Sequence, residues 1–393
     1  MRFLSLLILV FHLITFQSCS KKDSPESSGI KEPGTAGTKD TSKSCCDEKP
    51  SRFGNTVNAD SSISGISSNE QSAGTNNKTG SESNSGMVWI PGGEFIMGSD
   101  DEIAYEVEKP AHPVKVNGFW MDKTEVTNAE FRKFTDATGY ITIAERVPDW
   151  NELKKQLPPG TAAPDPKDLV PASLVYIKPK EKVYTEDVTM WWNWVPGANW
   201  KYPEGPGSTI KDRMDYPVVH IAYDDALAYC KWAGKRLPTE AEWEFAARNC
   251  LTNKKYAWGD ELRPGGKIMA NNWQGEFPNE DKGEDGYKNT SPAGKFPANC
   301  YGLFDMIGNV WEWTSDWYDS RAYMKLPKDK VTENPKGPLK PEDHEDPFAV
   351  KRVVKGGSFL CSDNYCFNYR PSARRGQAFD TGTSNVGFRC VKN

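Results

Sequence analysis

The chain changes character abruptly at Met87, and this boundary limits what can fold. Residues 20–86 are rich in Ser, Gly, Asn, Lys and Glu and contain a single aromatic residue, Phe53. A stretch of this composition cannot bury enough apolar surface to offset the entropy that it would lose on ordering. We therefore expect a disordered tether over 20–86, with a typical span of about 45 Å, and one folded domain over 87–393.

The domain expected over 87–393 must build its core from few but large side chains. The whole chain has 14 Trp, 33 Gly and 28 Pro, although only 37% of its residues are hydrophobic. Wide aromatic rings fill a core with few residues, and Gly and Pro interrupt regular structure. The composition predicts a single compact α+β domain with little regular secondary structure. The net charge of -5 provides no basic field for nucleic acid, so we expect no such partner.

Local signals place an opening strand and three helices. Alternating apolar residues over 87–95 indicate a strand and a turn. Capping boxes at 127–130 and 239–242, each with Thr followed by Glu three residues later, predict that a helix begins at each place. A further helix is expected over 224–233, where Gly234 would end it.

Two longer regions have weaker signals. Residues 151–215 are Pro-rich and irregular, and we expect them to form an ordered excursion over the surface. Residues 250–393 show short apolar runs between long Gly-, Asn- and Asp-rich segments. That pattern predicts short strands joined by long loops.

The first 19 residues have the features of a bacterial export signal. Met1 and Arg2 precede an apolar run over 3–16, which is too short to span a bilayer comfortably. The run ends near Ser18 and Cys19, and a small residue before a Cys at this place resembles the lipobox of bacterial lipoproteins. We therefore expect 1–19 to be a lipoprotein signal peptide. A lipid on Cys19 would hold the exported protein in the cell envelope, at its periplasmic or surface face. The alternative is an ordinary cleaved signal with an incidental Cys.

Cys361 and Cys366 are the candidate reactive residues, within the segment GGSFLCSDNYC at 356–366. Spacing alone favours a structural disulfide, because disulfides persist in exported proteins. The functional alternative is a dithiol that binds a soft metal, since Cu(I) prefers thiolate ligands. Two thiolates would leave an open position for a third sulfur, such as a substrate cysteine.

Four sequence blocks resemble a known family. They are WAGKRLPTEAEWE at 232–244, GNVWEWTSDW at 308–317, GGS at 356–358 and NVGFRC at 385–390. In this order, and across about 87–393, they resemble the sulfatase-modifying factor family, whose enzymatic members are the formylglycine-generating enzymes. The resemblance implies the fold of those enzymes, which is related to C-type lectins. Many relatives lack the cysteine pair, whereas this chain has both cysteines at the matching places, which favours catalysis over a disulfide.

The resemblance implies an oxidase that depends on copper and O2. Cys361 and Cys366 would hold Cu(I) as a bis-thiolate, and a substrate cysteine would bind as a third thiolate. That cysteine, in a Cys-x-Pro-x-Arg motif of an unfolded or nascent sulfatase, would be oxidised to formylglycine. Ser358 matches a family serine that lines the oxygen pocket. Asn385 and Trp311 match other residues of the family site.

The same resemblance implies two structural calcium sites. The first matching set is Asn271, Asn272, Asp285 and Tyr287. The second is Asp305, Gly308, Val310 and Glu312. Hard cations take such mixed shells of carboxylate and carbonyl oxygens. From spacing alone these segments are ordinary turns, and that alternative stays open.

Four further cysteines lie in the folded region. Cys230 and Cys390 match a family disulfide that joins a helix to the C-terminus. Closing a loop of this length contributes about 4 to 5 kcal/mol by the chain-entropy relation. Cys250 and Cys300 are then left over. We predict that they pair with each other, and the alternative is two buried thiols.

The histidines do not favour an iron site, and two other functions stay open. A related branch of the fold uses three His residues to bind iron, but His112 and His344 are expected in loops outside the motif blocks, so only His220 remains. A three-His site is therefore not expected. We expect a monomer. The main functional alternative is a non-catalytic binding lipoprotein of the envelope or gliding-motility type, and a third is a carbohydrate-binding module.

Overall fold

The computed structural model describes residues 84–248, 251 and 254–393. The expectations for 1–83, which include the lipid on Cys19 and most of the tether, lie outside these residues, as does Cys250. Within the described ranges, no helix is both long and apolar enough to cross a bilayer.

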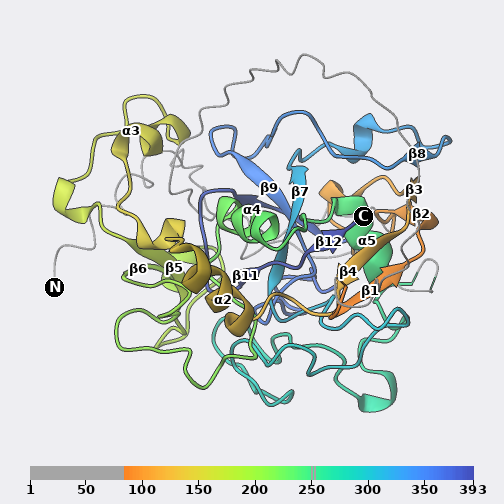
Figure 1. Cartoon of the computed structure of the whole chain (residues 1–393), viewed down its shortest axis with the longest axis horizontal. Helices are drawn as coiled ribbons and strands as arrows, with labels where there is room; N and C mark the ends of the chain where they lie inside the picture. Colours follow the sequence, from red (N-terminus) through yellow and green to blue (C-terminus); the bar gives the residue numbers. More distant parts are fainter. Residues whose placement is uncertain (1–83, 249–250, 252–253) are drawn as a thin grey trace, which may run out of the picture.

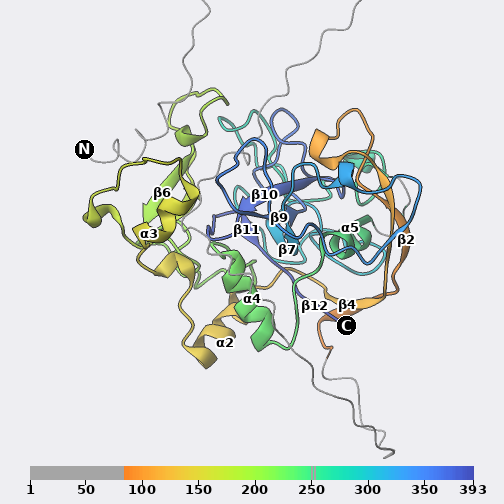
Figure 2. The same cartoon turned by 90° about the horizontal axis from the view of Figure 1, so that it is seen from above.

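Short helices and strands are joined by long loops throughout the described part of the chain (Figures 1 and 2). The α-helices are α2 (Asn128–Thr138), α3 (Trp150–Leu153), α4 (Tyr223–Trp232) and α5 (Glu240–Arg248). The first six strands are β1 (Met87–Ile90), β2 (Gly93–Met97), β3 (His112–Val116), β4 (Phe119–Asp122), β5 (Ala172–Tyr176) and β6 (Trp192–Pro196). The remaining strands are β7 (Trp311–Trp317), β8 (Thr332–Glu333), β9 (Lys351–Lys355), β10 (Arg374–Ala378), β11 (Val386–Gly387) and β12 (Val391–Lys392). This is the predicted α+β architecture with little regular secondary structure.

A mixed sheet with the strand order β10-β9-β7-β11 organises the centre of the domain. β7 and β9 are antiparallel, with Glu312 opposite Lys355 and Trp313 opposite Val354, whereas β11 runs parallel to β7. The smaller sheets have the orders β1-β4-β12, β2-β3-β8 and β5-β6. The central sheet therefore places β9, β7 and β11 side by side, although these strands are far apart along the chain.

Helices pack on this sheet through aromatic and apolar side chains. α5 contacts β7 and β9, and its Trp243 is fully buried. Tyr223 at the start of α4 meets Trp313 of β7, with ring centroids 5.8 Å apart. α2 packs on α4, where Phe131 and Tyr229 stack at 5.9 Å. Large rings therefore fill the core, as the composition predicts.

The helix starts predicted from capping boxes are present. Thr127 Oγ1 accepts a hydrogen bond from Glu130 N at 3.3 Å, and the Glu130 carboxylate accepts one from Thr127 N at 2.8 Å. Thr239 and Glu242 make the same reciprocal pair at 3.1 and 2.8 Å, at the start of α5. The third predicted helix, α4, starts and ends one residue earlier than expected.

Residues 151–215 are ordered and most of them lie at the surface, as expected, but two parts of the segment enter the core. Their strands β5 and β6 pair, and Trp191 and Trp200 are almost fully buried. Trp191 packs edge-on against Phe277 and Tyr365, with centroids 5.5 and 6.0 Å apart. The Pro content indicated irregular backbone correctly, whereas burial of the large Trp rings carries only these parts of the segment into the core.

Buried ion pairs tie these elements together. The pairs are Arg370–Glu108 at 2.6 Å, Arg374–Glu240 at 2.7 Å, Lys355–Glu244 at 2.8 Å and Arg389–Glu312 at 2.7 Å. A buried charge is costly unless it is paired and hydrogen-bonded. Each pair therefore fixes the position of one segment against another in a domain with few long strands.

Candidate active site

Cys361 and Cys366 lie at the two ends of a tight loop, and their sulfurs meet. The Sγ–Sγ distance is 2.9 Å, and both residues are thiols. Cys366 N donates to Ser362 O at 2.9 Å, which turns the chain back within the loop, and Trp273 N donates to Cys361 O at 2.9 Å. The fold thus brings together the two cysteines that the sequence singles out.

Ser358, Asn385 and Trp311 form a connected group next to Cys361. Cys361 N donates to Ser358 O at 2.9 Å. Asn385 Nδ2 donates to Ser358 Oγ at 2.9 Å, and Trp311 N donates to Asn385 O at 2.9 Å. All of these side chains are buried. The Trp311 Nε1–H is buried with no hydrogen-bond partner.

Two further side chains reach the cysteine pair without having been predicted. Asn368 Nδ2 donates to Cys366 Sγ at 3.1 Å. Tyr105 Oη accepts from Phe367 N at 3.3 Å. The pKa of Tyr105 lies above its ordinary value because of burial and then because of Cys366 beside it. Tyr105 is remote in sequence, so no local pattern could have found it, whereas Asn368 lies two residues from Cys366.

Neither thiol reaches the surface, since both cysteines are 0% exposed. The loop between them does reach it, because Asp363 and Asn364 are exposed. Tyr365, on the same loop, is buried and stacks on Phe277 with centroids 5.0 Å apart and planes 4° apart. A polypeptide can therefore reach the sulfurs only after side chains of this loop or its aromatic neighbours move.

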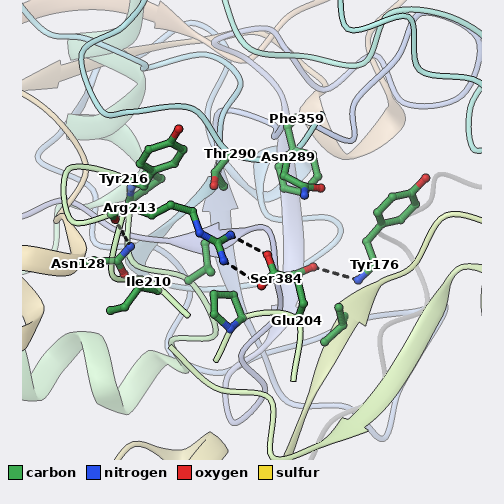
Figure 3. Close-up of a pocket in the computed structure, with 14 residues that line it drawn as sticks. Asn128, Tyr176, Glu204, Ile210, Arg213, Tyr216, Asn289, Thr290, Phe359 and Ser384 are labelled. Atoms are coloured by element: carbon green, nitrogen blue, oxygen red, sulfur yellow. Dashed lines mark hydrogen bonds and ion pairs between the residues drawn. The ribbon is translucent and has the colours of Figure 1, made fainter. Parts of the chain in front are cut away.

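A small cavity of about 50 Å³ lies beside the segments that carry Ser358 and Asn385 (Figure 3). Phe359 and Ser384 line it, and each directly adjoins a predicted site residue in the chain. Glu204 and Arg213 line it too and form an ion pair at 2.6 Å. Tyr176 N donates to Ser384 Oγ at 3.0 Å. Neither thiol is part of the lining, so this cavity is not where a substrate sulfur would meet the cysteines.

The first predicted calcium set has oxygens that converge on one donor. The Gln274 amide Nε2 contacts both the carbonyl oxygen of Asn272 and Asp285 Oδ2, the latter at 2.9 Å. Tyr287 N donates to Asp285 Oδ1 at 2.8 Å, and Asn271 lies in the same loop. Burial raises the pKa of Asp285, which a bound cation would offset. The donor set fits a hard cation.

The second predicted calcium set gathers negative charge. Glu312 accepts from Arg389 through both carboxylate oxygens at 2.7 Å. Burial raises the pKa of Asp305 to about 6. Glu125 was not predicted; its Oε2 is buried without a hydrogen-bond partner, and burial and then the Asp305 charge raise its pKa well above the usual range. A cation bound here would offset the buried charge of Asp305 and Glu125, with its remaining ligands supplied by amide and carbonyl oxygens.

Backbone atoms contribute to both predicted calcium sets. Among the described residues, no three His, Cys, Asp or Glu side chains are placed to hold a metal ion by themselves, so both shells would depend on amide and carbonyl oxygens. Gly308 has a φ of 83°, and a Cβ there would collide with the carbonyl of Asn271. Asn309 N donates to the same carbonyl at 2.8 Å. Gly308 and Val310 therefore lie in a turn that packs directly on the first set.

The three histidines of the folded domain have different surroundings, and the position of one of them was predicted wrongly. His112 is not in a loop; it begins β3, where it pairs with Met97 of β2, and it is buried. His220 is buried elsewhere, with Nδ1 2.8 Å from Ser173 Oγ. His344 is exposed. Strand pairing, which a single His does not reveal, accounts for the error at His112.

The remaining cysteines differ in state. Cys230 of α4 and Cys390 are buried thiols with sulfurs 3.0 Å apart, so the pair matched to a family disulfide is brought together. Burial raises the pKa of the Cys390 thiol well above its usual value. Cys300 is disulfide-bonded, whereas Cys250, its predicted partner, lies outside the described residues.

Comparison with known proteins assigns the family. The profile of the sulfatase-modifying factor enzyme 1-like domain matches residues 72–393. The formylglycine-generating enzyme of Mycobacterium tuberculosis is 47% identical over 305 residues, which are 78% of this chain and 97% of that protein. The enzyme of the same name from Bos taurus is 45% identical over 306 residues, which are 78% and 74% of the two chains.

Other similar proteins carry different names. A Mus musculus protein named inactive C-alpha-formylglycine-generating enzyme 2 is 37% identical over 319 residues, which are 78% of this chain and 85% of that protein. Among solved structures, PvdO from Pseudomonas aeruginosa aligns with a TM-score of 0.48 at 24% identity, over 78% of this chain and 94% of that one. From the profile match and the formylglycine-generating enzymes at 45–47% identity, the chain belongs to the sulfatase-modifying factor enzyme 1-like family.

Proposed function

We propose that this protein oxidises a cysteine of a sulfatase polypeptide to formylglycine, using Cu(I) and O2. The observation that carries the proposal is the meeting of two buried thiols, Cys361 and Cys366, with sulfurs 2.9 Å apart. Relatives named formylglycine-generating enzyme, at 45–47% identity over 78% of the chain, support the same reaction. The substrate would present the Cys-x-Pro-x-Arg motif in an extended, unfolded segment.

The reaction requires a reductant as well as O2. Converting the side-chain thiol of cysteine into an aldehyde removes sulfur as hydrogen sulfide and places one oxygen atom on the carbon. The second oxygen atom leaves as water, which takes up two electrons and two protons. We assign these electrons to a small thiol or dithiol in the same compartment. Thiol exchange of this kind would also reopen Cys361 and Cys366 if they close into a disulfide at rest.

The cysteine pair fits a monovalent copper ion by its chemistry. Soft thiolates select Cu(I) over hard cations, and both sulfurs point to the same place. Cys361 and Cys366 would hold the ion through their two sulfurs, which lie 2.9 Å apart in the described structure. Copper, when bound, would supply the means of activating O2 beside the substrate sulfur.

The surrounding residues exclude water and direct protons. Both cysteines and Ser358 have no exposed surface, so bulk water is kept from the reacting carbon. Ser358 Oγ accepts from Asn385 Nδ2 at 2.9 Å and from Leu360 N at 3.3 Å. Because both bonds use the oxygen as acceptor, its O–H remains available to donate to an oxygen species in the site.

We also infer that calcium binds the two sets described above as a structural ion. The raised pKa of Asp285 and that of Asp305 both indicate buried carboxyl groups that lack full compensation. A cation would supply that charge and stiffen loops with few ladder hydrogen bonds. We further propose export and a lipid anchor at Cys19, on the basis of the N-terminal sequence.

A binding protein on the same fold is the second candidate. The burial of both thiols favours it, because neither cysteine is exposed in the described structure. A 37% identical mouse relative with the name inactive C-alpha-formylglycine-generating enzyme 2 also favours it. In that case the thiol pair would hold the loop 361–366 in place and do no redox chemistry.

Mass spectrometry of a peptide substrate separates the two candidates. The full chain is loaded with Cu(I) and incubated in air with a thiol reductant and a Cys-x-Pro-x-Arg peptide. We expect the peptide to lose one sulfur and two hydrogens and to gain one oxygen. Cys361→Ser and Cys366→Ser should each abolish this change. The double variant Cys230→Ser/Cys390→Ser, which removes the other close thiol pair, should retain it. An unchanged peptide with copper-loaded parent protein would support the binding candidate instead.

A further inference from the structure

We propose that Asn368 is a positioning residue that orients the Cys366 sulfur through a hydrogen bond and thereby sets the affinity of the cysteine pair for Cu(I). The inference rests on the copper site proposed above and adds a residue to it. Asn368 Nδ2 donates to Cys366 Sγ at 3.1 Å, and both side chains are 0% exposed. The amide therefore faces the sulfur where no water competes.

The backbone around Asn368 is fixed from several sides. Arg370 Nε donates to Phe367 O at 2.8 Å, and Arg370 forms a bidentate ion pair with Glu108 at 2.7 and 2.6 Å. The carbonyl of Asn368 lies against Gly357, where a Cβ would approach it to 2.8 Å. The backbone that carries the Asn368 side chain is thus fixed by contacts that do not involve the cysteines, as a preorganised donor requires.

The direction of this bond singles out Cys366. Either sulfur can be the donor in the contact between the two cysteines, whereas the Asn368 amide donates to Cys366 Sγ. Cys366 is therefore the sulfur whose orientation this side chain fixes.

A charged sulfur needs this donor because burial works against it. Desolvation favours the neutral thiol over the thiolate. A hydrogen bond to an ionised acceptor is about twice as strong as one between neutral groups, so the Asn368 N–H favours the thiolate selectively. Cu(I) binds the thiolate form, and residues that hydrogen-bond a metal ligand typically change metal affinity by about 10- to 100-fold.

The test compares variants of Asn368 in the full chain. Asn368→Leu keeps the volume and removes the donor, and Asn368→Asp replaces the N–H with an acceptor. Cu(I) affinity is measured without O2, by competition with a chromogenic Cu(I) chelator at fixed pH. We expect Asn368→Leu to bind about 10- to 100-fold more weakly and Asn368→Asp to bind at least as weakly. Asn368→Ser, which keeps a donor, should recover part of the affinity.

A second readout needs no copper. The reduction potential of the Cys361–Cys366 pair is measured in glutathione buffers. Stabilisation of the reduced form makes a thiol pair more oxidising, so Asn368→Leu should shift the potential to a more negative value. Asn199→Leu is the matched control, because Asn199 is a buried amide whose Nδ2 donates to Gly197 O. It should change neither the potential nor the copper affinity.

The outcomes separate the inference from the proposed function. If folded Asn368→Leu binds Cu(I) within about two-fold of the parent, or keeps the parent potential, the role of Asn368 is refuted while the copper site stands. If Cys366→Ser binds Cu(I) as tightly as the parent, the copper site itself fails and the inference fails with it. If Asn368→Leu does not fold, Asn368→Ser and Asn368→Asp decide. Equal affinity in these two variants would also refute the inference.

Discussion

At the scale of single residues, His220 shows how burial fixes one protonation state. Its ring has no exposed surface, and its nitrogens lie 2.8 Å from Ser173 Oγ and 2.8 Å from Pro203 O. Burial lowers the pKa of His220 to about 4, because an imidazolium ion cannot be hydrated there. The fold therefore contains the neutral ring, and protonation of this ring in acid should destabilise the fold.

We expect His220 to contribute stability that acid removes. Its folded pKa of about 4 lies below the ordinary 6.5, so the unfolded chain takes up the proton first as the pH falls. The contribution is fully present above about pH 6.5 and is lost between 6.5 and 4. It is on the order of 3 kcal/mol, because each pH unit between the unfolded and the folded pKa corresponds to about 1.4 kcal/mol.

This expectation is tested with urea unfolding at a pH of about 7.5 and a pH of about 4.5, which lie on either side of the expected loss. His220→Asn should show a smaller loss of unfolding free energy at the lower pH than the parent does. Asn tolerates the positive φ of 61° at this position. His344→Asn, at an exposed His, should behave like the parent. An unchanged difference between the two pH values in His220→Asn would contradict the assignment.

The candidate site was only partly accessible from the sequence, for reasons that lie at this same scale. Ser358 stands within a recognisable block and Cys361 lies three residues after it, so their positions could be matched directly. Asn368 carries no pattern of its own, and its importance appears only when its amide meets a sulfur at 3.1 Å. Glu125 and Tyr105 approach from remote segments. Such contacts depend on packing, which a linear pattern does not encode.

At the scale of elements, α5 is joined to β9 by a buried charge pair. Lys355 Nζ lies 2.8 Å from Glu244 Oε2, and both side chains have no exposed surface. Burial alone would raise the pKa of Glu244, but the charges of Lys355 and Arg248 outweigh it and lower that pKa to about 2. The carboxylate also accepts from Gly98 N at 2.8 Å. One Glu therefore connects the helix to two separate parts of the chain.

We expect Lys355→Met to lower the free energy of unfolding by about 3 to 5 kcal/mol, because it leaves the buried Glu244 with one cation, Arg248, in place of two. The double variant Lys355→Met/Glu244→Gln should recover part of this loss, since it removes both charges. Lys340→Met, at an exposed Lys, is the control and should have little effect. Urea unfolding of the parent, the two single variants and the double variant completes a double-mutant cycle. Additive losses in the cycle would show that the pair is not coupled.

The elements differ in how far the sequence could predict them. α2 and α5 begin at capping boxes, a local signal that works through hydrogen bonds within four residues. β8, β11 and β12 are two residues long each, and only their partner strands make them strands. β5 and β6 were missed because Pro and polar residues surround them. Where a strand depends on a partner far along the chain, local sequence propensity does not predict it.

At the scale of the whole molecule, the long loops must be fixed in place although the strands between them are short. Both predicted calcium sets lie in such loops, between α5 and the end of the first central strand, β7. Gly308 packs one set on the other through the carbonyl of Asn271. We therefore expect calcium to act on the stability of the whole domain and not on one loop.

We expect Ca²⁺ to raise the unfolding free energy of the full chain, by about 2.7 kcal/mol at 100 times the dissociation constant of one site. Asp285→Asn and Asp305→Asn should each reduce this gain, because each removes a charged ligand. Asp329→Asn, at an exposed Asp, should keep it. Thermal unfolding with Ca²⁺, with Mg²⁺ and with a chelator measures the effect. Equal stability in all three conditions would reject both sites.

A second whole-molecule feature is the presence of two close thiol pairs. We expect one pair to be oxidised and the other to stay reduced. Cys230–Cys390 joins α4 to the C-terminal end of the chain, next to β12, with sulfurs 3.0 Å apart. Cys361–Cys366 must stay reduced to bind copper in the proposed function. The two pairs differ in what oxidation would achieve. The first would close a loop of most of the latter half of the domain, whereas the second closes only a short loop within one segment.

Of these two thiol pairs, only Cys230–Cys390 should therefore stabilise the protein when it is oxidised. In the chain-entropy relation the long loop contributes about 4 to 5 kcal/mol, a gain that Cys230→Ser/Cys390→Ser should lack under every redox condition. Urea unfolding of protein equilibrated in glutathione buffers, with peptide mapping of the disulfides, measures both the gain and its location. Cys361→Ser/Cys366→Ser is the matched control and should show the full gain. If that control loses the gain instead, the stabilising bond is at 361–366. The copper proposal would then lose its thiolates, because a pair that is more stable when bonded would resist reduction in an oxidising compartment.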